Sequence, residues 1–392
     1  MQRSLQVFID GRLVGTLAEP RTNKFTFAYD ADATDVVSAR LPFSNDRYPP
    51  ASVAPLVDSL APAEPKRLEL AERFDIPEHL LFRFLEISGN DLPGAITFEP
   101  HDGRDVGSGA APLATPLTPD DLRDELAVVA IDDGWALPSA GHPSSHMLRL
   151  EDELLPGAAA AELFALTLAR NAGVATVAAE LTSVYGIPAI VVARPDRTTT
   201  DTGDVVRRHL ETFGSLCGVA LEGDDDRIYE EQGGPGFVEV ATALDSYASD
   251  PQAAIRELVQ HMVLHFCTGN TNAHANTYSL LQPERTLGPV HTLLPAEIYT
   301  ELVTDDGTFD IDHRLAMSIG GCRESSDVTR GALIAEAASW PRLARTSAEL
   351  AVDQAVERIG VALPLAAAEM PGRPGSLDDL IEERLARLRI GG

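Results

Sequence analysis

The residues best placed to do chemistry lie in one segment, Gly269–Leu281, which reads GNTNAHANTYSLL. His274 stands near its centre, and an imidazole can take up or release a proton near neutral pH. Asn272, two residues earlier, has no basic lone pair and cannot accept a proton. His274 could therefore act as an acid–base group, or it could be a structural histidine that organises the loop.

Other candidate sites are weaker. His261 and His265 are i,i+4 neighbours that could begin a metal site, but no HExxH pattern or third ligand accompanies them, so a solvated or hydrogen-bonded pair is favoured. The glycine-rich Gly233–Gly236 could bind phosphate, although a turn between helices is the preferred interpretation. The acidic run 224–226 lacks the rest of an EF-hand loop, which favours a solvated turn. Cys267 lies on an apolar helix and is predicted to be core. No GxSxG nucleophile elbow is present.

The charge of the chain excludes several function classes. Its 392 residues include 31 basic and 60 acidic ones, for a net charge of −29, which opposes non-specific binding to nucleic acid and favours a basic partner. Lys24 and Lys66 are the only lysines, so a lysine-dependent mechanism beyond them is excluded.

No apolar run reaches the ~20 residues of a membrane span. Three widely spaced cysteines and an N-terminus without a signal-peptide pattern predict a cytoplasmic protein.

The elements around the loop indicate a small α+β domain, a β-rich lobe and a helical lobe, at 1–102, 121–197 and 198–392, with a linker at 103–120. The first domain begins with a hairpin that turns at Asp10-Gly11, followed by helical patterns at 64–74 and 78–87 and a strand before residue 100. The other expected elements are strands at 125–131, 135–137 and 145–150, a helix at 158–172, two strands within 177–194, and helices at 252–267, 328–360 and 376–390.

The segment Gly269–Leu281 resembles the catalytic loop of the HipA-type Ser/Thr kinases, toxins of bacterial toxin–antitoxin pairs, which reads approximately GNTDAHAKNFSLL. The N-terminal hairpin is also similar to the family's first domain. The other similar segments, in family order, are GNDLPGAITFEP at 89–100, SSHMLRL at 144–150, VARPDR at 192–197, GGPGF at 233–237, LGPVHTLLPAEIY at 287–299 and LAMSIGG at 315–321. The resemblance covers nearly the whole chain. It implies that His274 organises the loop.

The resemblance also shows where family residues are replaced. The loop Asp that accepts the proton of the attacking hydroxyl is Asn272 here, and the Asn that ligates Mg²⁺ is Thr277. Asn276 stands where the family has Lys. In the metal-binding segment the family's Asp is Thr292, and a neutral hydroxyl is a poor ligand for a hard cation. Base and metal ligands are thus predicted to be lost.

The nucleotide-binding residues are replaced as well. The family's phosphate-contacting Lys matches Arg149. Its AGAQ-type glycine-rich stretch, whose backbone N–H groups approach phosphate, matches 122–125 (LRDE), with Arg123 and Glu125. With the preceding two residues, DD, this places four acidic groups where they would repel ATP. Glu211 matches an acidic position of the family.

The sequence therefore predicts an α+β, HipA-like, bilobed fold related to protein kinases, with an extra N-terminal α+β domain and a mainly helical C-lobe. The favoured function is a pseudokinase that acts by protein binding in a toxin–antitoxin-type system, with a basic, helix-turn-helix antitoxin-like partner and no cofactor. One alternative is an active Ser/Thr kinase that binds Mg-ATP and uses displaced residues such as Asn276 and Glu211. Another is a nucleotide- or phosphate-sensing module.

Overall fold

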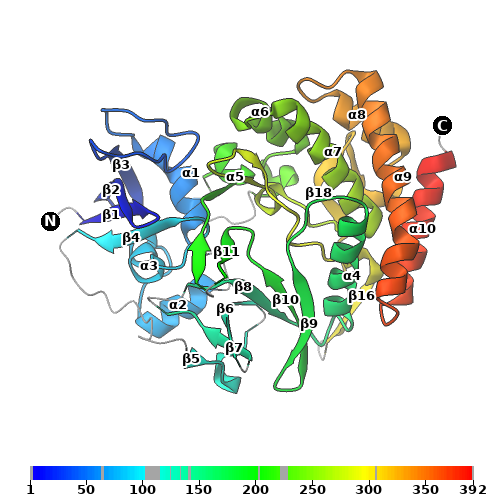
Figure 1. Cartoon of the computed structure of the whole chain (residues 1–392), viewed down its shortest axis with the longest axis horizontal. Coiled ribbons are helices and arrows are strands. Elements are labelled where there is room, and N and C mark those ends of the chain that lie inside the picture. Colours follow the sequence, from blue (N-terminus) through cyan, green and yellow to red (C-terminus); the bar gives the residue numbers. More distant parts are fainter. Residues whose placement is uncertain are drawn as a thin grey trace.

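A computed structural model describes residues 3–62, 66–101, 115–123, 125–132, 134–139, 143–201, 204–220, 228–304 and 307–390. Most of the predicted linker 103–120 and the whole acidic run 224–226 lie outside these ranges. The described residues form an N-terminal domain at one side of the molecule, a sheet-based lobe, and a helical lobe at the opposite side (Figure 1). The expected α+β architecture is confirmed.

The N-terminal domain is a four-stranded antiparallel sheet, of order β3-β2-β1-β4, packed against helices. Its first hairpin turns at Asp10 and Gly11, whose φ angles of 49° and 72° are the left-handed values that the predicted type I′ turn requires. The elements are β1 (Arg3–Ile9), β2 (Arg12–Arg21), β3 (Lys24–Tyr29), α1 (Pro50–Leu60), α2 (Lys66–Phe74), α3 (Leu81–Ser88) and β4 (Ile96–Pro100).

Helix α1 was not expected, because its sequence is rich in proline. Pro50 occupies the start of the helix, where its missing N–H has no partner to lose. Pro55 lies inside the helix and is buried together with Val53 and Leu56. Burial of this apolar face against the sheet outweighs the hydrogen bond that Pro55 removes.

The second lobe is a six-stranded sheet of order β5-β7-β6-β8-β10-β9, and helix α4 packs against it. Its strands are β5 (Thr115–Pro116), β6 (Glu125–Ile131), β7 (Gly134–Leu137), β8 (His146–Leu150), β9 (Ala179–Val184) and β10 (Ile187–Ala193), and α4 spans Ala158–Asn171. The predicted strands and helix of this lobe are confirmed. Strand β8 lies inside the sheet, between β6 and β10.

The helical lobe surrounds α7, which is buried along most of its length. Several short strands, which were not predicted, interrupt the helices. The expected helix at 328–360 is two helices, which span 330–338 and 345–369. The helices are α5 (Phe213–Leu216), α6 (Phe237–Tyr247), α7 (Pro251–Thr268), α8 (Arg330–Ala338), α9 (Arg345–Glu369) and α10 (Gly375–Ile390). The strands are β11 (Arg197–Thr199), β12 (Val205–Arg207), β13 (Leu210–Thr212), β14 (Ser279–Leu281), β15 (Thr286–Leu287), β16 (Glu301–Thr304), β17 (Gly307–Asp310), β18 (Arg314–Ile319) and β19 (Cys322–Glu324).

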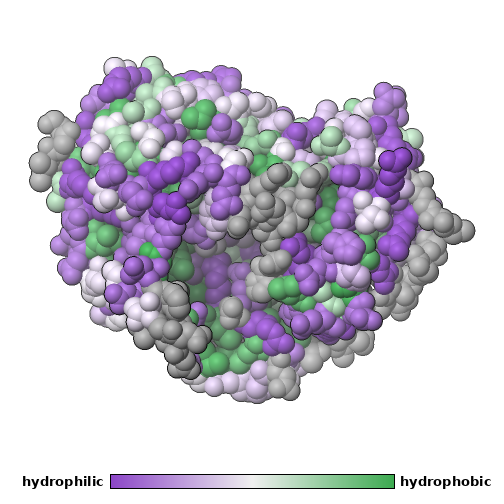
Figure 2. All heavy atoms as spheres, turned by 180° about the vertical axis from the view of Figure 1, so that it is seen from behind, coloured by the Kyte–Doolittle hydropathy of each residue, from purple (hydrophilic) through white to green (hydrophobic). Residues whose placement is uncertain are grey.

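The surface agrees with the strong net charge. Seen from behind, the molecule is mostly hydrophilic, with small apolar patches and a hollow near the middle (Figure 2). Among the described residues, no helix is both long enough and apolar enough to cross a membrane.

A buried cluster of charges fastens the N-terminal domain to the sheet-based lobe. Asp196 accepts hydrogen bonds from the guanidinium groups of Arg194 (2.7 Å) and Arg197 (2.8 Å) and from the backbone N–H of Gly94 (2.6 Å). Arg197 also pairs with Asp91 of the N-terminal domain at 3.1 Å. Burial alone would raise the pKa of Asp196, but the two arginines lower it to about 2. The VARPDR segment therefore forms the joint between the two units.

We predict that Asp196→Asn lowers the free energy of unfolding by about 3 kcal/mol at pH 7, because two buried guanidinium groups lose their counter-charge. Since the folded pKa of Asp196 lies below its usual value, its stabilisation is complete above about pH 4 and is lost as the pH falls towards 2. Urea unfolding should therefore show that the difference in free energy of unfolding between the wild type and Asp196→Asn becomes smaller as the pH falls over that range. As a control, Asp312→Asn removes an exposed partner of Arg314 and should cost less than about 1 kcal/mol.

Candidate functional site

The best-defined group of polar side chains surrounds Arg149 on β8. Its register partner on β6 is Glu125, and the Nε of Arg149 donates to the Glu125 carboxylate at 3.0 Å. Its Nη1 pairs with Glu162 of α4 at 2.5 Å. The Glu162 side chain is 5% exposed and that of Arg149 19%, so this pair is shielded from solvent. The ion pair links the sheet to the helix packed on it.

The same guanidinium reaches the segment that follows β15. Nη2 of Arg149 donates to the hydroxyl of Thr292 at 3.0 Å and to the carbonyl of His291 at 3.4 Å. The backbone N–H of Leu293 donates to Glu162 at 3.1 Å. Arg149 and Glu162 thus hold this segment against the sheet-based lobe.

The charge balance of this cluster is negative. Burial opposes the charge of Arg149, but the carboxylates of Glu162 and Glu125 outweigh it and raise the pKa of this guanidinium. Four hydrogen bonds already occupy most of the five N–H donors of Arg149. One guanidinium between two carboxylates leaves a net charge of −1. Little donor capacity and no net positive charge remain for an anionic ligand.

The loop 269–277 is held in a defined shape by its neighbours. Gly269 ends α7 in the left-handed conformation, with φ at 72°. The side chain of Asn270 lies 2.8 Å from Nδ1 of His265, and the carbonyl of Thr271 accepts from Ala316 of β18 at 2.8 Å. In the last turn of α7, just before the loop, Arg384 of α10 donates to the carbonyl of Phe266. These contacts fix the loop without using the residues expected to do chemistry.

Within the loop, Asn272 and His274 face different surroundings. Asn272 is exposed, and its side chain makes no hydrogen bond to another described residue. Nδ1 of His274 accepts from the backbone N–H of Asn276 at 3.2 Å, and the His274 ring packs edge-on against Tyr229, with centroids 5.7 Å apart. Burial lowers the pKa of His274 to about 4, so the imidazole is neutral at pH 7. Its described contacts organise the loop.

Asn276 and Thr277 lie at the inner end of the loop. Asn276 packs so closely against Gly214 that a Cβ at that position would clash with its amide oxygen. This oxygen is buried and has no hydrogen-bond partner among the described residues. Thr277 donates its backbone N–H to the carbonyl of His274 at 2.9 Å, closing a short turn. The structure therefore places the Asn276 amide in the interior.

Glu211 lies on β13 and is 3% exposed. Its carboxylate accepts from the backbone N–H of Ala39 at 2.8 Å and from the amide of Gln282 at 2.5 Å. Ala39 belongs to the N-terminal domain, so Glu211 joins this domain to the helical lobe. None of its described partners belongs to the loop 269–277.

The structure describes only part of the acidic stretch around 122–125. Of the four acidic groups expected together, Glu125 does reach the Arg149 cluster. Asp121 instead caps a short helical turn by accepting from Thr118, and these hydrogen bonds lower its pKa. Arg123 is exposed, and its guanidinium donates to the neighbouring carbonyl of residue 122 at 2.6 Å. Asp124 and the Asp120 side chain lie outside the described residues.

The histidine pair of α7 is buried rather than solvated. His265 is paired with Asn270, whereas Nε2 of His261 has no hydrogen-bond partner in the described structure. Burial lowers the pKa of His261 to about 4 and that of His265 to about 3. The described part of the chain contains no group of three side chains arranged to hold a metal ion.

The other two weak candidates agree with their structural interpretations. Gly233 and Gly236 lie in the turn before α6, as predicted. Cys267 is fully buried in the core, which is also confirmed, and burial raises the pKa of its thiol to about 12.

Sequence reasoning missed Glu162, the closest partner of Arg149. A signal was present, because α4 reads AAAAELFALTLARN and Glu162 is its only carboxylate, with apolar residues on both sides in the sequence. A charged residue on the buried face of a helix requires a partner of opposite charge.

The chain matches two family profiles and is similar to several known proteins. Residues 5–99 match the family profile described as "HipA N-terminal domain", and residues 123–364 match the profile described as "HipA-like C-terminal domain". Two proteins of Sinorhizobium fredii are similar: "Putative kinase Y4mE", 28% identical over 81% of each chain, and "Putative kinase Y4dM", 27% identical over 64% of each. A chain from the complex of HipA, HipB and operator DNA of Shewanella oneidensis MR-1 has the same fold, with a TM-score of 0.80, 19% identity, and coverage of 98% of this chain and 95% of that one.

The buried histidines predict a pH-dependent stability. Between about pH 6.5 and 4 the unfolded chain binds protons that the folded His261 and His274 do not, so stability falls as the pH falls. At pH 5 each histidine should cost about 2 kcal/mol relative to pH 7. Urea unfolding at pH 7 and pH 5 should show that His261→Phe loses less free energy of unfolding at the lower pH than the wild type does. A variant of the exposed His79, His79→Gln, should behave as the wild type does; equal losses in all three proteins would contradict the assignment.

Proposed function

We propose a binding role rather than a catalytic one for this chain, which belongs to the HipA family. In this proposal it is a pseudokinase of a toxin–antitoxin-type system and acts through contacts with another protein. The observation that carries the proposal is the engagement of Arg149 by two carboxylates and by Thr292. Phosphoryl transfer requires a free positive group for phosphate, a base and a set of metal ligands.

The first requirement is a positive group free to contact phosphate. In the family resemblance this group is a lysine at the position of Arg149. Here Glu125, Glu162 and Thr292 engage most of the N–H donors of the guanidinium, and the cluster keeps a net charge of −1. A nucleotide triphosphate would have to displace Glu125 and approach a second carboxylate, which is unfavourable in a partly buried site.

The second requirement is a base for the attacking hydroxyl. The family's carboxylate position is Asn272, whose exposed amide cannot accept a proton. His274 does not replace it, since its Nδ1 is already an acceptor for the backbone of Asn276. Loss of a general base alone slows a reaction by about 10²–10⁴.

The third requirement is a set of oxygen ligands for Mg²⁺, which the residues present do not supply. Thr292 offers a neutral hydroxyl that already accepts from Arg149, so a fixed positive charge stands beside the position of the family's metal-binding Asp. Thr277 is also neutral, and the Asn276 amide oxygen is buried against Gly214. Mg²⁺ binds through carboxylates and phosphates in such sites, and none of these three residues supplies a carboxylate.

The proposed partner is a basic protein of the helix-turn-helix antitoxin type. The net charge of −29 supports such a partner, because it would steer a basic protein towards this chain. The similar chain from Shewanella oneidensis comes from a complex with HipB and operator DNA. In such a complex the partner, rather than this acidic chain, would carry the contacts to DNA.

The second candidate function is an active Ser/Thr kinase with an unusual site. The two Sinorhizobium relatives, whose names describe them as kinases, favour it. So does the pairing of a basic strand residue with a helix glutamate, which kinases require. Its displaced catalytic residues would be Asn276 and Glu211. Their described contacts do not support these catalytic roles, because Asn276 packs on Gly214 and Glu211 accepts hydrogen bonds from Ala39 and Gln282.

We predict neither autophosphorylation nor ATP turnover above a denatured control when the purified protein is incubated with Mg²⁺-ATP. Millimolar ATP should also leave the melting temperature unchanged, whereas a ligand at 100 times its Kd would add about 2.7 kcal/mol of stability. Intact-mass spectrometry and thermal melting with and without Mg²⁺ measure both. A time- and ATP-dependent gain of one phosphate would establish the active-kinase alternative instead.

We further predict that Asn272→Asp alone does not restore phosphoryl transfer, because the restored base would face a cleft without metal ligands. Adding Thr292→Asp and Thr277→Asn should first recover Mg²⁺ affinity, measured by calorimetry. Turnover should require Arg149→Lys and a glycine-containing replacement of 122–125 as well. Activity in Asn272→Asp alone would show that the rest of the cleft is intact.

A further inference from the structure

A second buried ion pair lies beside the start of the loop 269–277. Arg384 of α10 pairs with Glu297, which lies in the short helical turn Ala296–Ile298. Their side chains are only 4% and 7% exposed. The hydroxyl of Ser325 accepts from Arg384 at 3.1 Å and donates to Glu297, so the two charges share a third polar partner. The C-terminal helix is thereby joined, in the interior, to a segment 87 positions earlier in the chain.

The same guanidinium also holds the end of α7. It donates to the carbonyl of Phe266, in the last turn of that helix, and lies over the Phe266 ring at 4.5 Å. The last four carbonyls of a helix lack partners within the helix, and a positive group at this end is favourable. Arg387, one turn further along α10, also lies over this ring, at 5.4 Å. Helix α10 therefore caps α7 close to the point where the loop begins.

Glu297 reaches the first residue of the loop. Its backbone N–H donates to the carbonyl of Gly269 at 3.2 Å. Gly269 is closely enclosed, because a Cβ at this position would lie 2.7 Å from the Leu380 side chain of α10 and 3.1 Å from the Glu297 carboxylate. The start of the loop is thus held between α10 and the turn that contains Glu297.

We propose that Arg384 is a positioning residue for the loop 269–277 and that α10 acts through it as a clamp. By joining Phe266 to Glu297, one guanidinium fixes the end of α7 relative to the segment 296–299, and so fixes where the loop starts. The hydrogen bonds described for 272–277 are all between near neighbours in sequence, so they shape the loop without anchoring it. The clamp operates whether the loop binds a partner or takes part in catalysis.

The clamp is tested by hydrogen exchange of the full chain, measured by mass spectrometry. Glu297→Gln removes the charge of one partner and should speed exchange in peptides covering 269–277 and 296–299 by about tenfold or more, the effect of losing one hydrogen bond between charged groups. Exchange in α4 and β10 should stay unchanged over the same labelling times. A general loss of stability would speed exchange in those elements as well.

A double variant, Arg384→Met with Glu297→Leu, separates the clamp from the cost of an unpaired buried charge. Removing both charges leaves neither one unpaired, so the fold should be kept, which circular dichroism checks. The hydrogen bond from α10 to the Phe266 carbonyl is still lost, so exchange in 269–277 should remain faster than in the wild type.

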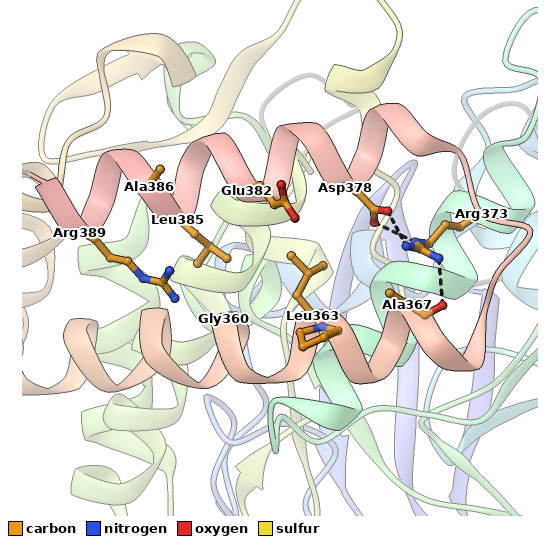
Figure 3. Close-up of a pocket in the computed structure, with 10 residues that line it drawn as sticks. Gly360, Leu363, Ala367, Arg373, Asp378, Glu382, Leu385, Ala386 and Arg389 are labelled. Atoms are coloured by element: carbon orange, nitrogen blue, oxygen red, sulfur yellow. Dashed lines mark hydrogen bonds and ion pairs between the residues drawn. The ribbon is translucent and has the colours of Figure 1, made fainter.

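The matched control is Asp378→Asn, which breaks another ion pair of α10. Arg373 and Asp378 pair at one end of the groove between α9 and α10 (Figure 3), and their described contacts do not reach the loop. Exchange in 269–277 should therefore match the wild type. Wild-type exchange of this loop in Glu297→Gln or in the double variant overturns the proposal. So does an equal rise in Asp378→Asn, because any weakening of α10 would then release the loop.

Discussion

The ion pair between Arg149 and Glu162 is the interaction on which the arrangement of the cleft depends. It joins the central strand β8 to helix α4, and through Thr292 and Leu293 it fixes the segment after β15. A guanidinium suits this role because its planar fork donates in several directions at once, whereas an ammonium group acts as a point charge. The same geometry leaves the guanidinium little capacity for a phosphate ligand. One side chain therefore stabilises the fold and limits its chemistry.

The loop after α7 illustrates that shape and catalysis have separate requirements. Asn270, Thr271 and His274 hold the loop through contacts with α7, β18 and the loop's own backbone. None of these contacts requires a carboxylate at position 272. The loop can thus keep its conformation after its base is replaced, and a folded, non-catalytic surface remains available for a binding partner.

Charge is distributed unevenly between the interior and the surface. Arg194, Asp196 and Arg197 form a buried joint in which nearly every donor and acceptor is satisfied. Removing one of these side chains would leave the others buried without their counter-charge, which is strongly destabilising. The excess of acidic residues lies mainly on the outside, where it keeps copies of the chain apart and favours basic partners.

The sequence alone determined many of the elements and the family resemblance, because hydrophobic periodicity and turn residues act over short distances. The hairpin at Asp10-Gly11, strand β8, α4 and α7 were all predicted from local pattern. Helix α1 and the short strands of the helical lobe were not, since their stability comes from packing against distant residues. Only the tertiary structure decided which groups meet: Glu162 lies 13 residues from Arg149 and Thr292 lies 143 residues from it. Glu211 likewise reaches Ala39 across 172 residues, and no local pattern encodes such a contact.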